Sequence, residues 1–261
     1  MKRTPIVPQL PLFPEEFHSL LAFSPVFDSS CSQEARVYYI DREGGLFLKS
    51  APKGSLKTEA DMNDFFHSKG LGPEVLSFLS GEQDWLLTRR ISGEDCTHPD
   101  YLSDPKRLCD TIAARLRQLH DADASGCPVA NRNESYLALA EKNHRMGKFD
   151  AALFPGHWGF ASGEEAWREI EANGKYLRPD ALLHGDYCLP NILLDDWQFS
   201  GFIELGNGGI GDRHIDIFWG VWTLNFNLKI NACYDRFLDV YGRDKITPEI
   251  LRTIAAFEVF G

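Results

Sequence analysis

The stretch His184-Gly-Asp-Tyr-Cys-Leu-Pro-Asn191 decides how this sequence is interpreted. It places an aspartate two residues after a histidine and an asparagine five residues after that aspartate. A carboxylate can accept or orient the proton of a substrate hydroxyl, and an amide oxygen is a suitable ligand for the hard Mg²⁺ ion. Taken alone, the same residues also suit a tight turn before a β-hairpin. The surrounding sequence therefore has to decide between a catalytic loop and a structural turn.

The residues on either side of this stretch favour the catalytic interpretation. The spacing of His, Asp and Asn is that of the catalytic loop of protein kinases. Glu204 lies on the next expected strand, where kinases carry a second magnesium-binding carboxylate. Lys49 ends an apolar strand, as does the kinase lysine that pairs with the nucleotide phosphates, and Glu59 begins the following helix. Their order along the chain predicts a nucleotide-dependent kinase.

The first third of the chain predicts strands around one helix. Alternating apolar and polar residues indicate strands, and the Glu43-Gly44-Gly45 turn joins the first two of them. A helix is expected between the N-cap Thr58 and the C-terminal stop Gly70. The expected strands cover residues 35–40, 46–49, 75–78 and 85–88.

The rest of the chain is mostly helical in pattern. Asp104-Pro105 is a helix start, and a hairpin is expected near residues 191–205 before three closing helices. We therefore expect an α+β, two-lobed protein-kinase-like fold with a small β-rich N-lobe and a larger, mostly helical C-lobe. Residues 1–91 would form the nucleotide-binding lobe, and residues 92–261 the catalytic and substrate-binding lobe.

Composition excludes several classes of function. A net charge of −11 leaves no positive surplus for the phosphates of nucleic acid, so we expect no nucleic-acid partner. The acidic balance suits a cationic small molecule, although it also serves solubility. Since no run approaches the roughly 18 apolar residues of a membrane span, we expect no membrane partner.

The cysteines and the N-terminus indicate where the protein works. The six cysteines are scattered without CxxC spacing, which disfavours a zinc site or a redox dithiol. Reduced thiols in a cytoplasmic protein are expected instead. Prolines at positions 5, 8, 11 and 14 interrupt any signal-peptide core and predict an extended N-terminal arm. We expect a monomer or a homodimer.

Several stretches together resemble the aminoglycoside 3′-phosphotransferase family. They are residues 184–191, Phe199-Ser-Gly-Phe-Ile-Glu-Leu-Gly206, Asp212-Arg-His-Ile-Asp-Ile217, and Leu119-His-Asp-Ala-Asp123 with Cys127-Pro128. The resemblance extends from about Ala35 to Phe260 and is strongest over residues 184–217. It implies a kinase-like fold that holds ATP between two lobes, with GTP as the alternative nucleotide.

The resemblance also implies roles for individual residues. Phosphoryl transfer would use a catalytic base, a magnesium ion held by oxygen ligands, a lysine–glutamate pair at the phosphates, and backbone groups along the adenine. A further acidic residue near the C-terminus would bind the acceptor. The matching catalytic base is Asp186, and the matching metal ligands are Asn191 and Glu204. The lysine–glutamate pair would be Lys49 and Glu59, and the adenine would lie along Arg89 and Ile91. Glu258 would be the acceptor-binding acid. Asp216 would hold the catalytic loop in place.

Some positions depart from the family pattern. Glu204 stands where the family has aspartate, and the extra methylene matters because Mg²⁺ requires near-octahedral geometry with short bonds. Asn207 replaces the arginine usually found after Leu-Gly. Glu258 matches the C-terminal glutamate, but Phe257 precedes it in place of an acid, and residues 222–227 carry no carboxylate. The acceptor site is therefore expected to be less anionic than in the family.

The sequence as a whole predicts an ATP-dependent phosphotransferase. It would move the γ-phosphoryl group to a hydroxyl of a cationic small molecule, with an aminoglycoside as the first expectation and antibiotic resistance as the consequence. Two alternatives stay open. One is a kinase for a different hydroxylated small molecule, and the other is a nucleotide-binding pseudokinase weakened by Glu204.

Overall fold

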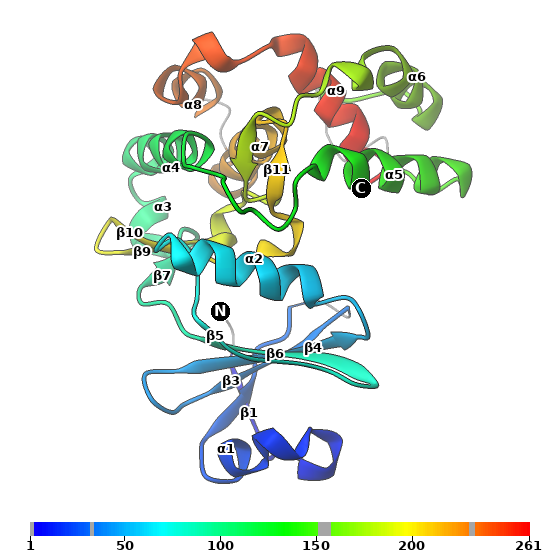
Figure 1. Cartoon of the computed structure of the whole chain (residues 1–261). Coiled ribbons are helices and arrows are strands. Elements are labelled where there is room, and N and C mark those ends of the chain that lie inside the picture. The colour runs from blue at the N-terminus through cyan, green and yellow to red at the C-terminus, as the bar shows by residue number, and fades with distance from the viewer. Residues whose placement is uncertain (1–2, 32–33, 151–157, 230–232) are drawn as a thin grey trace. The chain divides into compact units, whose positions relative to one another are not determined.

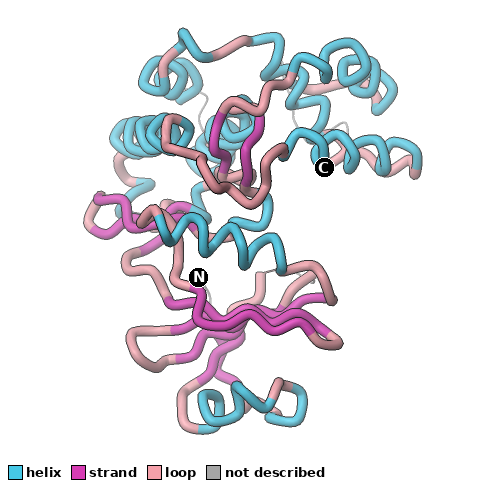
Figure 2. The backbone as a smooth tube through the Cα atoms, viewed as in Figure 1, coloured by secondary structure: helices cyan, strands magenta, loops and turns pink. Residues whose placement is uncertain are grey.

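The computed structural model describes residues 3–31, 34–150, 158–229 and 233–261, and its elements are labelled in Figure 1. The chain forms two compact units. Unit 1 comprises Met1–Gly93 together with the returning segment Ser200–Gly206. Unit 2 comprises Glu94–Phe199 and Asn207–Gly261. The α+β class, with a β-rich first part and a helical second part, is confirmed (Figure 2).

Unit 1 is built on an antiparallel sheet of six strands in the order β1-β2-β3-β4-β6-β5. The helix α2 (Lys57–Ser68) packs beside β5. Lys49 lies on the long strand β4, opposite Leu86 of β6, so its position is fixed from both neighbouring strands. The strands are β1 (Thr4–Ile6), β2 (Val26–Asp28), β3 (Arg36–Ile40), β4 (Leu46–Pro52), β5 (Val75–Ser80) and β6 (Gln83–Arg89).

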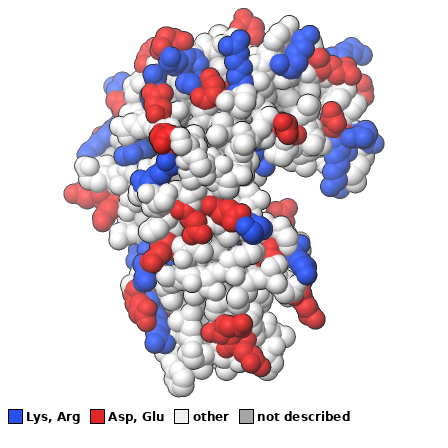
Figure 3. All heavy atoms as spheres, in the orientation of Figure 1, with Lys and Arg blue, Asp and Glu red and all other residues white. Residues whose placement is uncertain are grey.

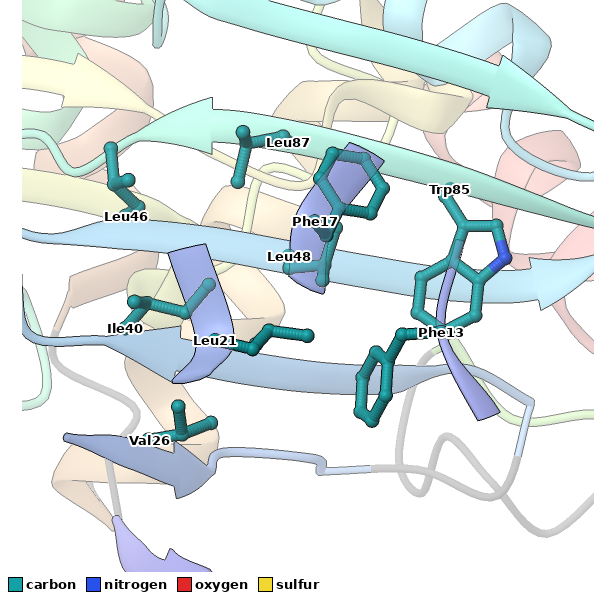
Figure 4. Packing of buried hydrophobic residues seen from close by; sticks show 9 residues of the cluster. All are labelled: Phe13, Phe17, Leu21, Val26, Ile40, Leu46, Leu48, Trp85 and Leu87. Atoms are coloured by element: carbon teal, nitrogen blue, oxygen red, sulfur yellow. The ribbon is translucent and has the colours of Figure 1, made fainter. Parts of the chain in front are cut away.

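The N-terminal segment contributes much of the hydrophobic core of unit 1. Only Thr4–Ile6 is an extended strand, paired with β2, so the expected arm is correct for that part alone. The next residues form 3₁₀ turns at Leu10–Leu12 and Glu15–Phe17 and the helix α1 (His18–Ala22). They bury Phe13, Phe17 and Leu21 against Val26, Ile40, Leu46, Leu48, Trp85 and Leu87 of the sheet (Figure 4).

Unit 2 is mainly helical and carries two small sheets. The sheet β10-β9-β7 holds the expected hairpin, and β11 pairs antiparallel with β8. Its helices are α3 (Pro99–Leu102), α4 (Pro105–His120), α5 (Arg132–Arg145), α6 (Gly163–Asn173), α7 (His214–Leu228), α8 (Cys233–Tyr241) and α9 (Pro248–Glu258). Its strands are β7 (Glu94–Asp95), β8 (Ala181–Leu183), β9 (Ile192–Asp195), β10 (Gln198–Phe202) and β11 (Gly209–Gly211), and the chain passes from unit 2 into unit 1 within β10.

The surface carries both signs of charge. On the face drawn in Figure 3, Lys and Arg side chains are interspersed with Asp and Glu. Among the described residues, no helix combines the length and the apolar character needed to cross a bilayer.

Candidate active site

The stretch that contains Asp186 forms a loop between β8 and a 3₁₀ turn at Leu189–Asn191. Its conformation depends on Gly185, which has φ +83°. A Cβ at this position would lie 1.9 Å from the carbonyl oxygen of Asn207, so only glycine allows this approach. The loop is therefore packed directly on Asn207.

Asp216, in the first turn of α7, fixes the backbone of this loop. Its carboxylate oxygens accept hydrogen bonds from the N–H groups of His184, at 2.7 Å, and Gly185, at 2.8 Å. The imidazole Nε2 of His120 lies 3.3 Å from the same carboxylate. Since Asp216 and His184 are both fully buried, the contacts hold the loop rigidly to α7 and α4.

The side chains of Asp186 and Asn191 contact each other at the end of this loop. The amide nitrogen of Asn191 donates to a carboxylate oxygen of Asp186, at 2.8 Å, and to the carbonyl oxygen of Asp186, at 3.0 Å. Because the nitrogen faces Asp186, the carbonyl oxygen of the Asn191 side chain points elsewhere and can serve as a metal ligand. The Asn191 side chain is therefore oriented to supply one oxygen ligand to a magnesium ion. The N–H of Asp186 donates to Nδ1 of His184, which gives His184 a structural role.

Unit 1 holds a cluster of one lysine and two glutamates. The Nζ atom of Lys49 lies 3.0 and 2.8 Å from the carboxylate oxygens of Glu59, in the first turn of α2, and 2.7 Å from Glu204. Burial lowers the pKa of Lys49, but the carboxylates of Glu59 and Glu204 outweigh it and raise the pKa overall. Burial raises the pKa of Glu59, and Lys49 partly opposes that rise. Lys49 is thus held as a cation.

Glu204 lies two residues after the end of β10, in a left-handed backbone conformation with φ +59°. Its side chain is 47% exposed, whereas that of Lys49 is 15% exposed. The longer glutamate side chain reaches Lys49 and still presents a carboxylate to solvent, which is compatible with binding a cation. The neighbouring segment is anchored in unit 1, because the N–H of Phe202 donates to the carbonyl oxygen of Leu71.

Arg89 and Ile91 are placed at the end of β6 and just beyond it. The N–H of Arg89 already donates to the carbonyl oxygen of Glu74, and its guanidinium pairs with the carboxylate of Glu74 at 2.7 Å. A Cβ at Gly201 would lie 2.6 Å from Cδ1 of Ile91, so the Ile91 side chain packs on β10. The backbone N–H of Arg89 is therefore already hydrogen-bonded to Glu74. Of the backbone groups expected to contact adenine, the carbonyl of Arg89 and the backbone of Ile91 are left for that role.

Glu258 is buried at the end of α9. One of its carboxylate oxygens accepts hydrogen bonds from Tyr136, at 2.5 Å, and from the indole N–H of Trp219, at 2.9 Å. Burial raises the pKa of Glu258 to about 7, and the negative charge of Asp186 adds to this rise. Glu258 and Asp186 are therefore within electrostatic reach of each other in unit 2.

Sequence reasoning missed two groups that complete this part of the site. Tyr136, on α5, stacks on Phe257 with ring centroids 4.8 Å apart and donates to Glu258. Arg132, at the start of the same helix, donates to the side-chain oxygen of Asn207 at 2.7 Å. The pattern around residue 135 is polar and weakly periodic, so no local signal identified α5 as part of the site.

Comparison with known proteins finds relatives over most of the chain. Residues 31–253 match the family described as the phosphotransferase enzyme family. A probable aminoglycoside 3′-phosphotransferase of Lactococcus lactis is 46% identical over 95% of this chain and 95% of the relative. The aminoglycoside 3′-phosphotransferase of Niallia circulans is 27% identical over 95% of this chain and 97% of the relative.

Solved structures show the same fold. The crystal structure of an aminoglycoside 3′-phosphotransferase of type VIII has a TM-score of 0.72 and 26% identity, covering 89% of this chain and 91% of the other. An aminoglycoside phosphotransferase of Streptomyces rimosus, solved with ADP and streptomycin, has a TM-score of 0.68 and 20% identity over 86% of this chain and 90% of the other.

Proposed function

The chain belongs to the phosphotransferase enzyme family, and we propose that it phosphorylates a hydroxyl group of an aminoglycoside. It is an ATP-dependent enzyme that transfers a phosphoryl group to a small-molecule hydroxyl. The observation that carries the proposal is the Asp186 carboxylate, held by Asn191 on a loop fixed by Asp216. The name of the Lactococcus lactis relative supports an aminoglycoside as the acceptor. GTP remains an alternative nucleotide.

In the proposed reaction Asp186 orients the acceptor hydroxyl and accepts its proton. The hydroxyl oxygen forms a bond to the γ-phosphorus as the bond from that phosphorus to the departing ADP oxygen breaks. Lys49, kept charged by its two glutamates, binds nucleotide phosphates. Arg89 and Ile91 contribute to the adenine contact.

Magnesium is proposed as the metal, with the side-chain oxygens of Asn191 and Glu204 as ligands. When bound, the ion would neutralise charge on the nucleotide phosphates. The hydrogen bonds from the Asn191 nitrogen to Asp186 support this role, because they turn the Asn191 oxygen away from Asp186.

Changing Glu204 to glutamine is expected to raise the Mg²⁺ concentration needed for half-maximal turnover by about 10-fold or more, because a charged metal ligand is lost. Turnover should be titrated with Mg²⁺ at saturating ATP, with Glu82→Gln as the matched control, since Glu82 is exposed in the same unit. An unchanged Mg²⁺ requirement would show that Glu204 is not a metal ligand.

A separate variant, Glu204→Asp, tests whether the longer side chain limits the reaction. A large gain in its turnover would show that glutamate at this position weakens the enzyme.

Glu258 is the proposed acceptor-binding acid, because a buried carboxylate near Asp186 attracts an ammonium group. Since its pKa is about 7, protonation below that pH should weaken binding of a cationic acceptor. We expect the KM for the acceptor to rise about 10-fold from pH 8 to pH 6, as most of the carboxylate becomes neutral.

The matched variant for this prediction is Glu258→Gln, which keeps the side-chain size. Its acceptor KM should be high at pH 8 and should change little down to pH 6. Initial rates at fixed ATP over this range measure both proteins. A rise in KM of equal size in the variant would assign the titration to another group.

The same carboxyl group predicts the direction of the pH dependence of stability. The pKa of Glu258 is raised above the ordinary value of 4.5 in the folded state, to about 7. Between pH 4.5 and pH 7 the folded protein therefore keeps a proton on Glu258 that the unfolded chain has released. The protonated carboxyl group stabilises the folded state, and this stabilisation is lost as pH rises through 7.

The proposal is tested by nucleotide turnover against a panel of aminoglycosides with ATP and Mg²⁺. Turnover that depends on an aminoglycoside supports it. Turnover with another hydroxylated molecule alone would move the acceptor assignment. Such a result would agree with the lack of an acidic residue at Phe257 and across residues 222–227. ATP binding without turnover of any acceptor would identify a pseudokinase.

A cytoplasmic location is also proposed. It is supported by the cysteines, since all six lie in described parts of the chain and none forms a disulfide. Action as a monomer or a homodimer is proposed as well.

A further inference from the structure

Arg132 is a half-buried cation whose hydrogen-bond partners are uncharged. One guanidinium nitrogen donates to the side-chain oxygen of Asn207 at 2.7 Å, and another donates to the hydroxyl of Ser135 at 3.0 Å. Among the described residues, no carboxylate oxygen lies within 4.0 Å of this guanidinium. Arg145, at the other end of the same helix, pairs with Glu141.

The position of Arg132 is fixed relative to the Asp186 loop. Asn207, which it contacts, is packed on Gly185, the residue that precedes Asp186. The next residue of α5, Asn133, accepts a hydrogen bond from the N–H of Asp212, just beyond β11. Since β11 pairs with β8 and β8 leads into the loop, Arg132 and Asp186 belong to one substructure.

The pKa of Glu258 responds to the charges of both Asp186 and Arg132. The negative charge of Asp186 raises the pKa of Glu258, and the positive charge of Arg132 lowers it. Burial lowers the pKa of Arg132 itself, and the charge of Glu258 partly opposes this effect. Both Asp186 and Arg132 are therefore within electrostatic reach of one carboxylate.

A partly buried guanidinium without an ion pair at contact distance is costly, because it loses hydration and gains only a more distant charge in return. It also has N–H groups beyond the two already used, in a planar fork that matches a phosphate. A cationic acceptor would be repelled by it. The anion that the reaction brings to Asp186 is the phosphoryl group.

We propose that Arg132, oriented by Asn207, binds the phosphoryl group while it is transferred to the hydroxyl beside Asp186. This inference rests on the proposed phosphotransfer. The bond from phosphorus to the ADP oxygen breaks, the bond to the acceptor oxygen forms, and the hydroxyl proton goes to Asp186. Arg132 keeps its protons and neutralises charge on the phosphoryl oxygens. Arg132 reaches this place from α5 and contacts Asn207, which stands where the resembling family usually has an arginine.

The first test is the kcat of Arg132→Ala, with Arg145→Ala as the matched control on the same helix. We expect kcat to fall about 100-fold, as for loss of one donor to a developing anion, with a much smaller change in the acceptor KM. Guanidinium at millimolar concentration should recover at least about 10-fold of the loss, because it can occupy the vacated space. Arg132→Lys should retain part of the activity.

A second variant separates charge from structure. Arg132→Ala combined with Asn207→Arg carries a guanidinium on the neighbouring element, and it should regain kcat relative to Arg132→Ala alone. An unchanged kcat in Arg132→Ala would overturn the inference. So would a fall in kcat that neither guanidinium nor the second change reverses.

Failure of the proposed function gives a different result, since the unaltered protein would then turn over no acceptor. The inference is then decided by binding of inorganic phosphate, measured by calorimetry on the unaltered protein and on Arg132→Ala. Affinity at least about 10-fold weaker in the variant supports an anion site at Arg132. Equal affinity, or no binding to the unaltered protein, overturns it.

Discussion

Replacing Asp186 with alanine is expected to lower kcat by about 1,000-fold, because the acceptor hydroxyl loses the group that orients it and accepts its proton. The carboxylate also holds the amide nitrogen of Asn191, so its removal frees the proposed metal ligand to turn. Both effects act on the chemical step. Initial rates at saturating ATP and acceptor measure the loss.

Two further measurements make this result specific. Asp195→Ala, which removes an exposed carboxylate at the end of β9, should leave kcat unchanged. The melting temperature of Asp186→Ala should stay close to that of the unaltered protein, because Asp216 holds the loop through the N–H groups of His184 and Gly185. A loss of less than about 10-fold would mean that another group accepts the proton.

Local sequence signals predicted much of the fold. Asp104-Pro105 predicted a helix start, and the carboxylate of Asp104 accepts a hydrogen bond from the N–H of Arg107 at 3.2 Å. The apolar residues that follow at helical spacing are all buried in α4: Leu108, Ile112, Leu116 and Leu119. Caps and periodicity are visible in sequence because both ends of the interaction lie within a few residues of each other.

The N-terminal segment was harder to predict, for a physical reason. Phe13, Phe17 and Leu21 recur every four residues, which is the helical period, but the prolines around them indicated an extended chain. In the structure Pro11 lies within one short 3₁₀ turn and Pro14 caps the next, and the apolar side chains pack on the sheet. Burial against partners distant in sequence decided the conformation here.

In the candidate site, too, local motifs were predictable from the sequence and long-range contacts were not. The order of Lys49, Glu59 and the Asp186 stretch could be read from motif spacing, and the structure brings Glu59 against Lys49. The contacts of Glu258 with Tyr136 and of Arg132 with Asn207 join residues 122 and 75 positions apart. A single sequence carries no signal for such pairs, because neither partner belongs to a local pattern.

Changing Lys49 to methionine is expected to lower kcat/KM for ATP by about 100-fold, because the phosphates lose a charge-assisted contact. The same change leaves the buried carboxylate of Glu59 without its main cationic partner. We therefore also expect the free energy of unfolding to fall, by up to about 3 kcal/mol at pH 8. Lys57→Met, on the exposed face of α2, is the matched control.

The stability loss should depend on pH in a defined direction. Lys49 lowers the pKa of Glu59, so its removal raises that pKa further above the ordinary value of 4.5. A raised folded-state pKa gives stabilisation that is lost as pH rises, so Lys49→Met should be closer in stability to the unaltered protein at pH 6 than at pH 8. Denaturant unfolding at the two pH values measures this difference.

The double variant Lys49→Met with Glu59→Gln separates stability from catalysis. Removing the unpaired carboxylate should restore most of the lost unfolding free energy, since no buried charge is left without a partner. Turnover should remain low, because the phosphate-binding cation is still missing. If turnover recovered together with stability, Lys49 would act only by neutralising the charge of Glu59, and phosphate binding would have to be assigned to another cation.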